Sequence, residues 1–277
     1  MLNTILKPIL KPILERNEIF KNKFHGKTCY IFGNGSSVKN IDFSYFAEHP
    51  TIAINHLVLH CDFHLLDVCA YIVPEPFSFY KFFKNPYSLK YEENIIGNLL
   101  RSQIAHYPDI NLFTSFTNVI NRGFKNTYYL HHFGHRAPDI HHNDISSEFS
   151  FLAGGLQAAV GLAINFGFEK AILVGCDYLM KPKNYGHFYS SPHFPGKDNG
   201  VNPYKELLQN CSSKIKLEAI SDYPVDSWLP CTDYESFTGA KINYRENTEI
   251  VSNENLLILN QAYKLGQYHL KIFLDED

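Results

Sequence analysis

Short apolar runs that stop at a glycine, an asparagine or a proline recur along the chain. Three of them cover residues 28–32, 51–54 and 69–73, and they stop at Gly33, Asn55 and Pro74. Strands that are covered on both faces show such continuous apolar runs instead of a polar and apolar alternation. The pattern therefore predicts a doubly wound parallel sheet, with ligands bound at the carboxyl ends of its strands.

The second half of the chain contains the clearest unit of this kind. Residues 154–167 form an apolar stretch that glycines bound on both sides, and residues 170–174 form a strand-like run that leads to Gly175 and Asp177. A buried helix, a tight connection and a buried strand follow from this order. Further helices are expected at 204–210 and 254–265, and a strand at 214–217. Residues 76–150, which are rich in Phe, Tyr, Asn and His, predict helices plus a long mobile segment.

The first 27 residues differ from the rest in charge. They hold six basic and two acidic residues, a net charge of +4, whereas the whole chain has a net charge of −3. Pro8 and Pro12 leave residues 2–14 at best a broken amphipathic helix. Its apolar side would hold Ile5, Ile9, Ile13 and Leu14. We expect a basic amphipathic arm at 1–27, packed on the domain or on another subunit, or lying on an anionic membrane surface. Residues 28–277 form the main domain, with a lid at about 179–204.

Composition excludes several classes of protein. The chain has 277 residues, of which 45% are apolar and 19% are charged, so it is a folded globular protein. Its slightly negative net charge argues against a nucleic-acid partner. Six cysteines without a CxxC pair argue against a disulfide framework or a zinc ribbon. No secretory signal or membrane-spanning segment is visible, which favours a cytoplasmic protein.

Metal-dependent chemistry is also disfavoured by the sequence. The chain has 14 histidines, but none belongs to an HExxH motif. Its Asp-x-Asp motif is Asp275–Asp277, and the end of a chain is a poor place for a clamp on a magnesium diphosphate. We therefore expect no metal site and a metal-free chemistry on a nucleotide.

The turn after the first strand is the main candidate for nucleotide binding. Gly33–Asn34–Gly35 would let backbone N–H groups approach a phosphate or a sugar. It is not the full dinucleotide fingerprint, because Val38 stands at the third glycine and Asn55 at the acidic position, so NAD and FAD are disfavoured. Asn34 and Asn55 can bind a base or a ribose through their amides, although asparagine is also common in turns for its own reasons.

Other candidates follow the later elements. Gly154–Gly155 would offer free N–H groups at a helix start to an anion, or would allow close helix packing. Asp177 follows a strand at the same edge of the sheet. An aspartate in that position caps a helix or a turn as often as it takes part in binding or catalysis. The segment from Tyr185 to His193 has two histidines that could move a proton and tyrosines that could bind a phosphate.

Together these pieces resemble a known family. Residues 33–42 read GNGSSVKNID, with Ser36 where the family has proline, and Asn55 and the block 154–177 follow in the family's order. The chain resembles the small bacterial sialyltransferases of glycosyltransferase family 42, within the wider DUF115 or MptE-like superfamily. The resemblance implies an α/β, modified Rossmann-like (GT-A-type) parallel sheet with helices on both faces and a small lid subdomain.

The resemblance also implies an activity. It is the inverting, metal-independent transfer of sialic acid, or of a related keto sugar such as Kdo or legionaminic acid. The donor is CMP-activated, and the acceptor is a hydroxyl of a glycan or glycolipid in lipopolysaccharide, lipooligosaccharide or capsule synthesis. No cofactor is implied beyond this substrate. A homo-oligomer and a contact of the N-terminal arm with the inner membrane are further expectations.

Site residues follow from the same resemblance. The nucleotide-binding positions are Gly33, Asn34, Gly35, Ser36, Asn55, Gly154, Gly155 and Asp177. A third asparagine of the family falls near Val73. Tyr185 would assist the departing phosphate, and His193 would be the general base, with His187 as the alternative. Two other functions remain open: a magnesium-dependent, pterin diphosphokinase-like enzyme, and a non-catalytic subunit that binds a nucleotide sugar.

Overall fold

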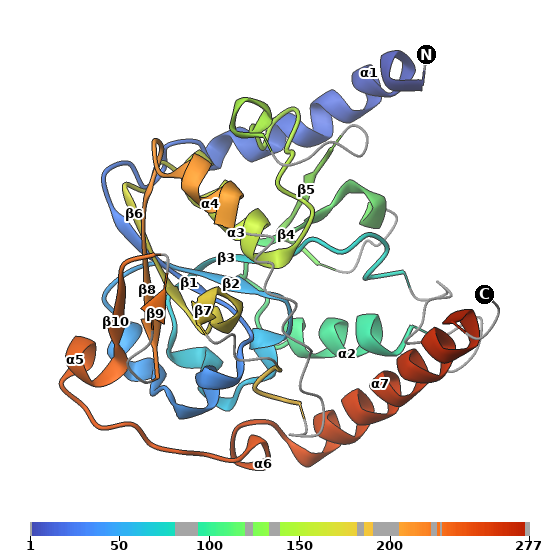
Figure 1. The fold of residues 1–277 in the computed structure, drawn as a ribbon. Coiled ribbons are helices and arrows are strands. Elements are labelled where there is room, and N and C mark those ends of the chain that lie inside the picture. Colours follow the sequence, from blue (N-terminus) through green and yellow to red (C-terminus); the bar gives the residue numbers. More distant parts are fainter. Residues whose placement is uncertain are drawn as a thin grey trace.

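The computed structural model describes residues 2–80, 94–119, 124–132, 139–181, 186–190, 205–222, 226–227 and 229–274. Figure 1 shows a central sheet between helical layers. Its strands are β1 (Thr28–Phe32), β2 (Thr51–Ile54), β3 (Val68–Val73), β4 (Leu112–Ser115), β5 (Thr127–Leu130), β6 (Lys170–Val174), β8 (Lys216–Ser221) and β10 (Cys231–Asp233). The order is β10-β8-β6-β1-β2-β3-β4-β5, and every neighbouring pair is parallel. The predicted parallel α/β fold is confirmed.

Alternate side chains of the central strands enter two separate cores. Cys29 and Ile31 of β1 face one core, whereas Tyr30 and Phe32 face the other. The first core is covered by α3 (Gly155–Asn165), α4 (Lys205–Cys211) and the short helix η1 (Glu15–Phe20). The second is covered by α2 (Ile95–Ile104), α5 (Tyr234–Thr238), α6 (Asn247–Ile250), α7 (Asn253–Leu274) and the short helices η2 (Ser36–Asn40), η3 (Phe43–Phe46), η4 (Asn55–Leu59) and η5 (Cys61–Leu65). The predicted helices on both faces are therefore present.

The order of the strands in the sheet has its switch point at β1. The strands β2, β3, β4 and β5 follow on one side of β1, and β6, β8 and β10 follow on the other. Such a switch brings the turns after β1 and β6 together at the carboxyl edge of the sheet, which is where ligands bind in open α/β sheets. The strands predicted at 28–32, 51–54 and 170–174 are confirmed as β1, β2 and β6.

The N-terminal arm corrects one prediction. Helix α1 (Leu2–Leu14) is continuous through Pro8 and Pro12, which lie on its exposed side. Leu10 and Leu14 are buried, whereas Ile9 is 58% exposed. Packing against β5 fixes which face is buried and supports the helix where the two missing N–H groups would otherwise break it. The prediction of a broken helix with Ile9 on its apolar side was wrong.

The middle segment corrects a second prediction. Residues 76–150 contribute not only α2 but also β4 and β5, two strands of the central sheet.

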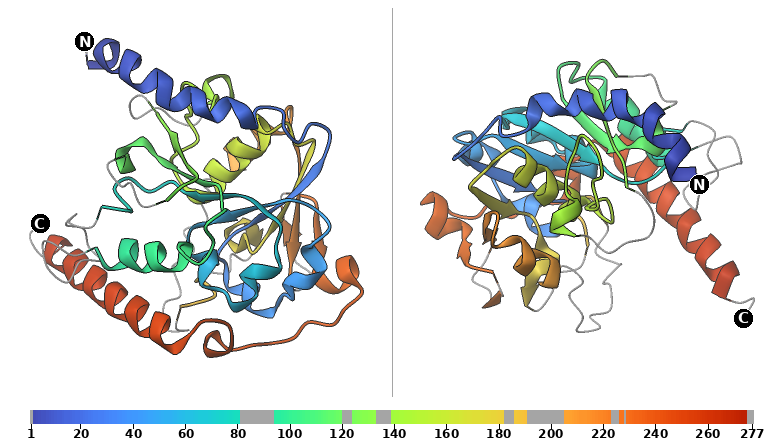
Figure 2. Two further views of the ribbon diagram at one scale, coloured as in Figure 1. Left: turned by 180° about the vertical axis from the view of Figure 1, so that it is seen from behind. Right: turned by 90° about the horizontal axis from the view of Figure 1, so that it is seen from above.

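Within the lid expected at about 179–204, the structure describes 179–181 and 186–190. There β7 (Met180–Lys181) pairs antiparallel with β9 (Asp226–Ser227). Figure 2 shows that α1 and α7 extend toward the same side of the molecule. No helix among the described residues has both the length and the apolar composition needed to cross a membrane.

Candidate functional site

The turn after β1 packs directly against the turn after β6. The N–H of Gly33 donates to Val174 O at 2.8 Å, and the N–H of Gly35 donates to Gly175 O at 2.8 Å. A Cβ atom would lie 2.5 Å from Gly175 O at Gly33, and 2.4 Å from Asp177 Cγ at Gly35. The two glycines are therefore required for close packing of the turns. Both N–H groups are bonded within the protein, so they are not free for a phosphate in this structure, and their role in nucleotide binding stays a prediction.

Asp177 fixes the start of η2. Its carboxylate accepts hydrogen bonds from Ser37 N at 2.8 Å, Ser37 Oγ at 2.5 Å and Ser36 Oγ at 3.2 Å. Burial raises the pKa of Asp177 to about 6, against the opposing effect of the serine donors. Ser36 and Asp177, both predicted to bind the nucleotide, thus bind each other, and neither lines the cavity described below.

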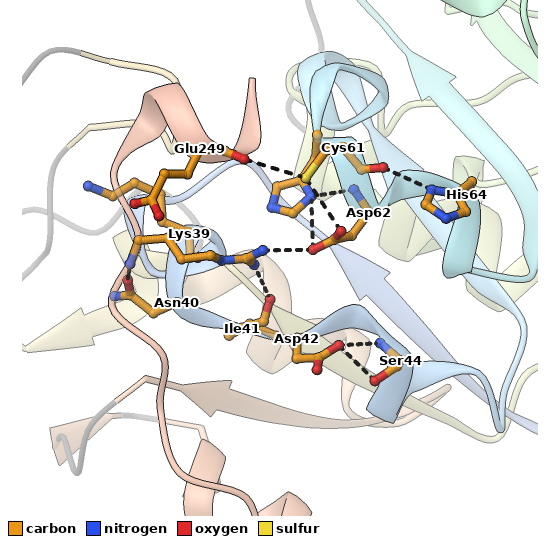
Figure 3. Close-up of polar contacts among 11 residues, drawn as sticks. Lys39, Asn40, Ile41, Asp42, Ser44, Cys61, Asp62, His64 and Glu249 are labelled. Atoms are coloured by element: carbon orange, nitrogen blue, oxygen red, sulfur yellow. Dashed lines mark hydrogen bonds and ion pairs between the residues drawn. The ribbon is translucent and has the colours of Figure 1, made fainter. Parts of the chain in front are cut away.

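Arg245 fixes the other end of η2, where Figure 3 labels Lys39, Asn40 and Ile41. Its guanidinium donates to Lys39 O at 2.7 Å, to Ile41 O at 2.9 Å and to Asp62 Oδ2 at 2.8 Å. Arg245 lies in the segment that joins α5 to α7. The same contacts that hold the turn after β1 therefore also attach the C-terminal segment to the body of the protein.

A cavity of about 340 Å³ opens at the carboxyl ends of β1, β2 and β3. This volume lies in the range of small-molecule binding sites. Its described lining residues are Asn34, Asn55, His56, Glu75, Pro76, Phe77, Ser78, Asn94, Ile96, Gly97, Leu100, His187, Tyr189 and Tyr263. Of the predicted site residues, Asn34, Asn55 and His187 meet here, although they lie far apart in the sequence.

Three buried polar atoms of these lining residues have no hydrogen-bond partner among the described residues. They are Asn34 Oδ1, Asn55 Oδ1 and His56 Nε2. A buried polar atom without a partner is costly, and most such atoms in proteins are satisfied. Asn34 and Asn55 thus line the cavity, and each has a side-chain oxygen that no described residue satisfies and that is shielded from solvent in this structure.

Asn55 is held in one orientation. Its backbone is in the left-handed region, with φ at 47°, and Tyr71 Oη donates to its carbonyl oxygen. Its Nδ2 donates to Glu75 Oε1 at 2.7 Å. Helix α3 starts beside it, because a Cβ atom at Gly155 would lie 3.5 Å from Asn55 Nδ2 and 2.4 Å from Ile54 Cγ2. Gly155 is thus needed for close packing, and it brings the α3 N-terminus to the edge of the site.

His187 is oriented by the turn after β1. Its Nδ1 lies 3.2 Å from the carbonyl oxygen of Asn34, which also accepts from Phe188 N at 3.1 Å. A carbonyl only accepts, so the neutral imidazole carries its proton on Nδ1 and leaves Nε2 as a base. Burial lowers the pKa of His187, which keeps the ring neutral at neutral pH.

A chain of side chains supports the His187 ring. Tyr189 stacks on it, with ring centroids 5.0 Å apart. The Tyr189 hydroxyl lies 3.2 Å from His56 Nδ1 and 3.1 Å from the hydroxyl of Tyr263 on α7. Burial lowers the pKa of His56 to about 3. The last helix of the chain therefore contributes directly to the site.

Several of these residues were not predicted from the sequence. Glu75 follows β3 as Asn34 and Asn55 follow β1 and β2, so the rule that function lies at strand ends could have found it. His56 follows Asn55 after β2, so the same rule could have found it, and Tyr189 lies in the segment from Tyr185 to His193 whose tyrosines were predicted to bind a phosphate, whereas Tyr263 carries no such signal. Tyr185 and His193, predicted to act in catalysis, lie outside the described residues. Gly154 is the N-cap of α3 and does not line the cavity.

One group of side chains has the composition of a metal site. Ligand atoms of His60, Cys61 and Asp62 lie within 4.8 Å of one another. However, His60 Nδ1 already accepts from Asp62 N at 3.1 Å, and the Arg245 guanidinium lies against the Asp62 carboxylate (Figure 3). A cation here would face a positive charge, so the contacts fit a helix cap better than a metal centre.

Comparisons with known proteins gave one structural likeness. No protein-family model matches the chain, and no curated protein matches it significantly. Among solved structures, it is similar to the sialyltransferase CstII from Campylobacter jejuni in complex with a substrate analogue, cytidine-5'-monophosphate. The identity is 14% and the TM-score 0.43, over 86% of this chain and 99% of that chain. At this level of similarity, function must be argued from the residues of the site.

Proposed function

We propose that this chain is a glycosyltransferase that uses a CMP-activated keto sugar, sialic acid or a close relative, as its donor. In this proposal the transfer inverts the anomeric centre and needs no metal. The acceptor is a hydroxyl of a glycan or glycolipid. The observation that carries the proposal is a pair of asparagines, Asn34 and Asn55, that line a cavity at the carboxyl ends of β1 and β2 and whose buried side-chain oxygens have no partner among the described residues.

The donor groups of a cytidine nucleotide suit this pair. Cytosine has an exocyclic amine and ribose has two hydroxyls, and each of these can donate to a carbonyl oxygen. No lysine or arginine is among the described residues that line the cavity. The phosphate therefore belongs elsewhere, and the N-terminus of α3 beside Asn55 is the nearest group with a favourable dipole.

His187 suits the role of general base. As the acceptor hydroxyl attacks the anomeric carbon, its oxygen forms the new glycosidic bond and its proton passes to His187 Nε2. The bond from the anomeric carbon to the phosphate oxygen breaks, and CMP leaves with that electron pair. A neutral imidazole whose Nδ1 proton is held by the Asn34 carbonyl is prepared to accept this proton.

The first test is calorimetry of the full chain with CMP, UMP, GMP and AMP in the presence of EDTA. We expect binding that is selective for CMP. Asn34→Ala should weaken CMP binding about tenfold, because it removes one hydrogen-bond acceptor from the site. Absence of CMP binding would refute the proposal. Binding of another nucleotide that requires Mg²⁺ would favour the diphosphokinase-like alternative.

The second test separates binding from chemistry at His187. His187→Asn keeps an N–H near the Asn34 carbonyl but removes the base. We expect it to bind CMP as the wild type does, while release of CMP from CMP-sialic acid falls by about two to four orders of magnitude. His106→Asn, an exposed histidine outside the cavity, is the matched control. Wild-type protein that binds CMP but never consumes a CMP-sugar would point to a non-catalytic subunit.

A further inference from the structure

Glu75 is the one formally charged residue among the described residues that line the cavity. It follows β3 directly after Pro74, and its side chain is exposed toward the cavity. Its Oε1 accepts a hydrogen bond from Asn55 Nδ2. A carboxylate has further acceptor capacity beyond one such bond. Glu75 therefore combines a contact to the end of β2 with open acceptor sites that face the ligand space.

The contact between Glu75 and Asn55 fixes the direction of the amide. A carboxylate can only accept, so the amide must turn its Nδ2 toward Glu75 and its Oδ1 away from it. That Oδ1 is buried and has no partner among the described residues. The Tyr71 hydroxyl holds the Asn55 backbone in place. The Glu75 carboxylate and the Asn55 amide are thus fixed side by side among the residues that line the cavity.

A neutral ligand group with two adjacent donors complements such a pair. A phosphate or a sugar carboxylate in direct contact with Glu75 would be repelled, because no cation among the described lining residues offsets that charge, whereas the α3 N-terminus beside Asn55 favours the phosphate. A vicinal diol has two neighbouring O–H donors and no charge. In doubly wound folds an acidic residue at the end of the second strand often binds the ribose in this way. Here Asn55 occupies that position, and the carboxylate comes from the next strand.

We propose that Glu75, together with Asn55, binds the ribose diol of the nucleotide and so makes the site specific for ribonucleotides over deoxyribonucleotides. This inference rests on the proposed function, because the ribose is that of the CMP moiety. Glu75 is then a specificity-determining residue, and the β3 carboxylate replaces the one that is absent from β2.

The test combines two changes to the ligand with two substitutions of Glu75. Calorimetry with CMP, 2'-deoxy-CMP and 3'-deoxy-CMP is carried out on wild type, Glu75→Ala and Glu75→Gln. We expect wild type to bind CMP about 10- to 100-fold more tightly than at least one deoxynucleotide, as for a hydrogen bond to a charged group. Glu75→Ala should bring this ratio close to one by weakening CMP alone. Glu75→Gln, which keeps one acceptor, should give an intermediate ratio.

The controls separate this inference from its alternatives. Glu169→Ala, at the amino end of β6, should leave every ratio unchanged. If Glu75→Ala weakens all three ligands equally, Glu75 only supports the structure and the inference is overturned. It is also overturned if wild type does not distinguish CMP from either deoxynucleotide. If wild type binds no CMP at all, the proposed function itself fails, which is a separate result.

Discussion

The buried carboxylate of Asp177 should control how the stability of the protein depends on pH. Two effects compete there: burial raises its pKa, and three hydrogen bonds from Ser36 and Ser37 lower it. Burial wins, and the pKa rises from 3.8 to about 6. Because the folded state binds this proton more tightly than the unfolded state, stability from this group is greatest below pH 3.8 and is lost as the pH rises through about 6.

The magnitude follows from the size of the shift. A rise of about two pKa units corresponds to about 3 kcal/mol of free energy of unfolding lost at neutral pH. Asp177→Asn removes the titration, while the amide oxygen can still accept from Ser37 N–H. We therefore expect the variant to be at least as stable as wild type at about pH 7.5. Between about pH 4.5 and pH 7.5, wild type should lose about 2 kcal/mol relative to the variant.

Urea unfolding followed by far-UV circular dichroism at the two pH values measures this double difference. Ser37→Ala serves as a second variant, because it removes a donor that lowers the Asp177 pKa and should extend the loss to higher pH. The reasoning is refuted if wild type and Asp177→Asn differ by the same free energy at both pH values. A wild type that gains stability relative to the variant as the pH rises would mean that the serine donors outweigh burial.

Three further changes test other contacts by the same unfolding measurement. Gly35→Ala should destabilise the fold by about 1–3 kcal/mol, because its Cβ would overlap the Asp177 carboxylate; an unchanged midpoint would contradict this. Arg245→Met should cost about 3 kcal/mol by removing the cation bonded to the Asp62 carboxylate, with Arg245→Lys recovering only part; equal stability of the three proteins would contradict it. Burial lowers the pKa of His60 to about 3. The neutral His60 ring therefore stabilises the folded state above pH 6.5, and this contribution to the free energy of unfolding is lost as the pH falls toward 3. His60→Asn keeps the acceptor for Asp62 N–H and should flatten that loss; an unchanged acid slope would contradict it.

The strands that could be predicted are those whose sequence shows full burial. β1, β2 and β6 are continuous apolar runs, and the structure buries them on both faces. β4 and β5 were missed because each lies in an aromatic and polar region instead of forming a continuous apolar run, and β5 has two half-buried tyrosines. β5 pairs on one side only in the sheet order, and α1 packs against it, so its burial depends on contacts far away in the chain.

The candidate site was predictable where it follows strand ends. Asn34 and Asn55 were found by that rule, and both line the cavity. Tyr263 could not be found in this way, since it lies on a helix whose position depends on the Arg245 contacts and on packing against α2. For Gly33 and Gly35 the sequence could not show which neighbour requires the glycines. A glycine pair shows that something comes close to the backbone, and here that neighbour is the turn after β6.

This last point changes what the Gly-Asn-Gly sequence means as a signature. Its two glycines are required because the turn after β1 packs closely on the turn after β6. A chain in which these two turns pack in the same way needs the glycines whatever it binds. Shared glycines are then evidence of common architecture only. In the proposed function, chemical selectivity belongs to Asn34, Asn55 and Glu75, which line the cavity. Searches for proteins of like function gain more from those three positions than from the glycines between which Asn34 stands.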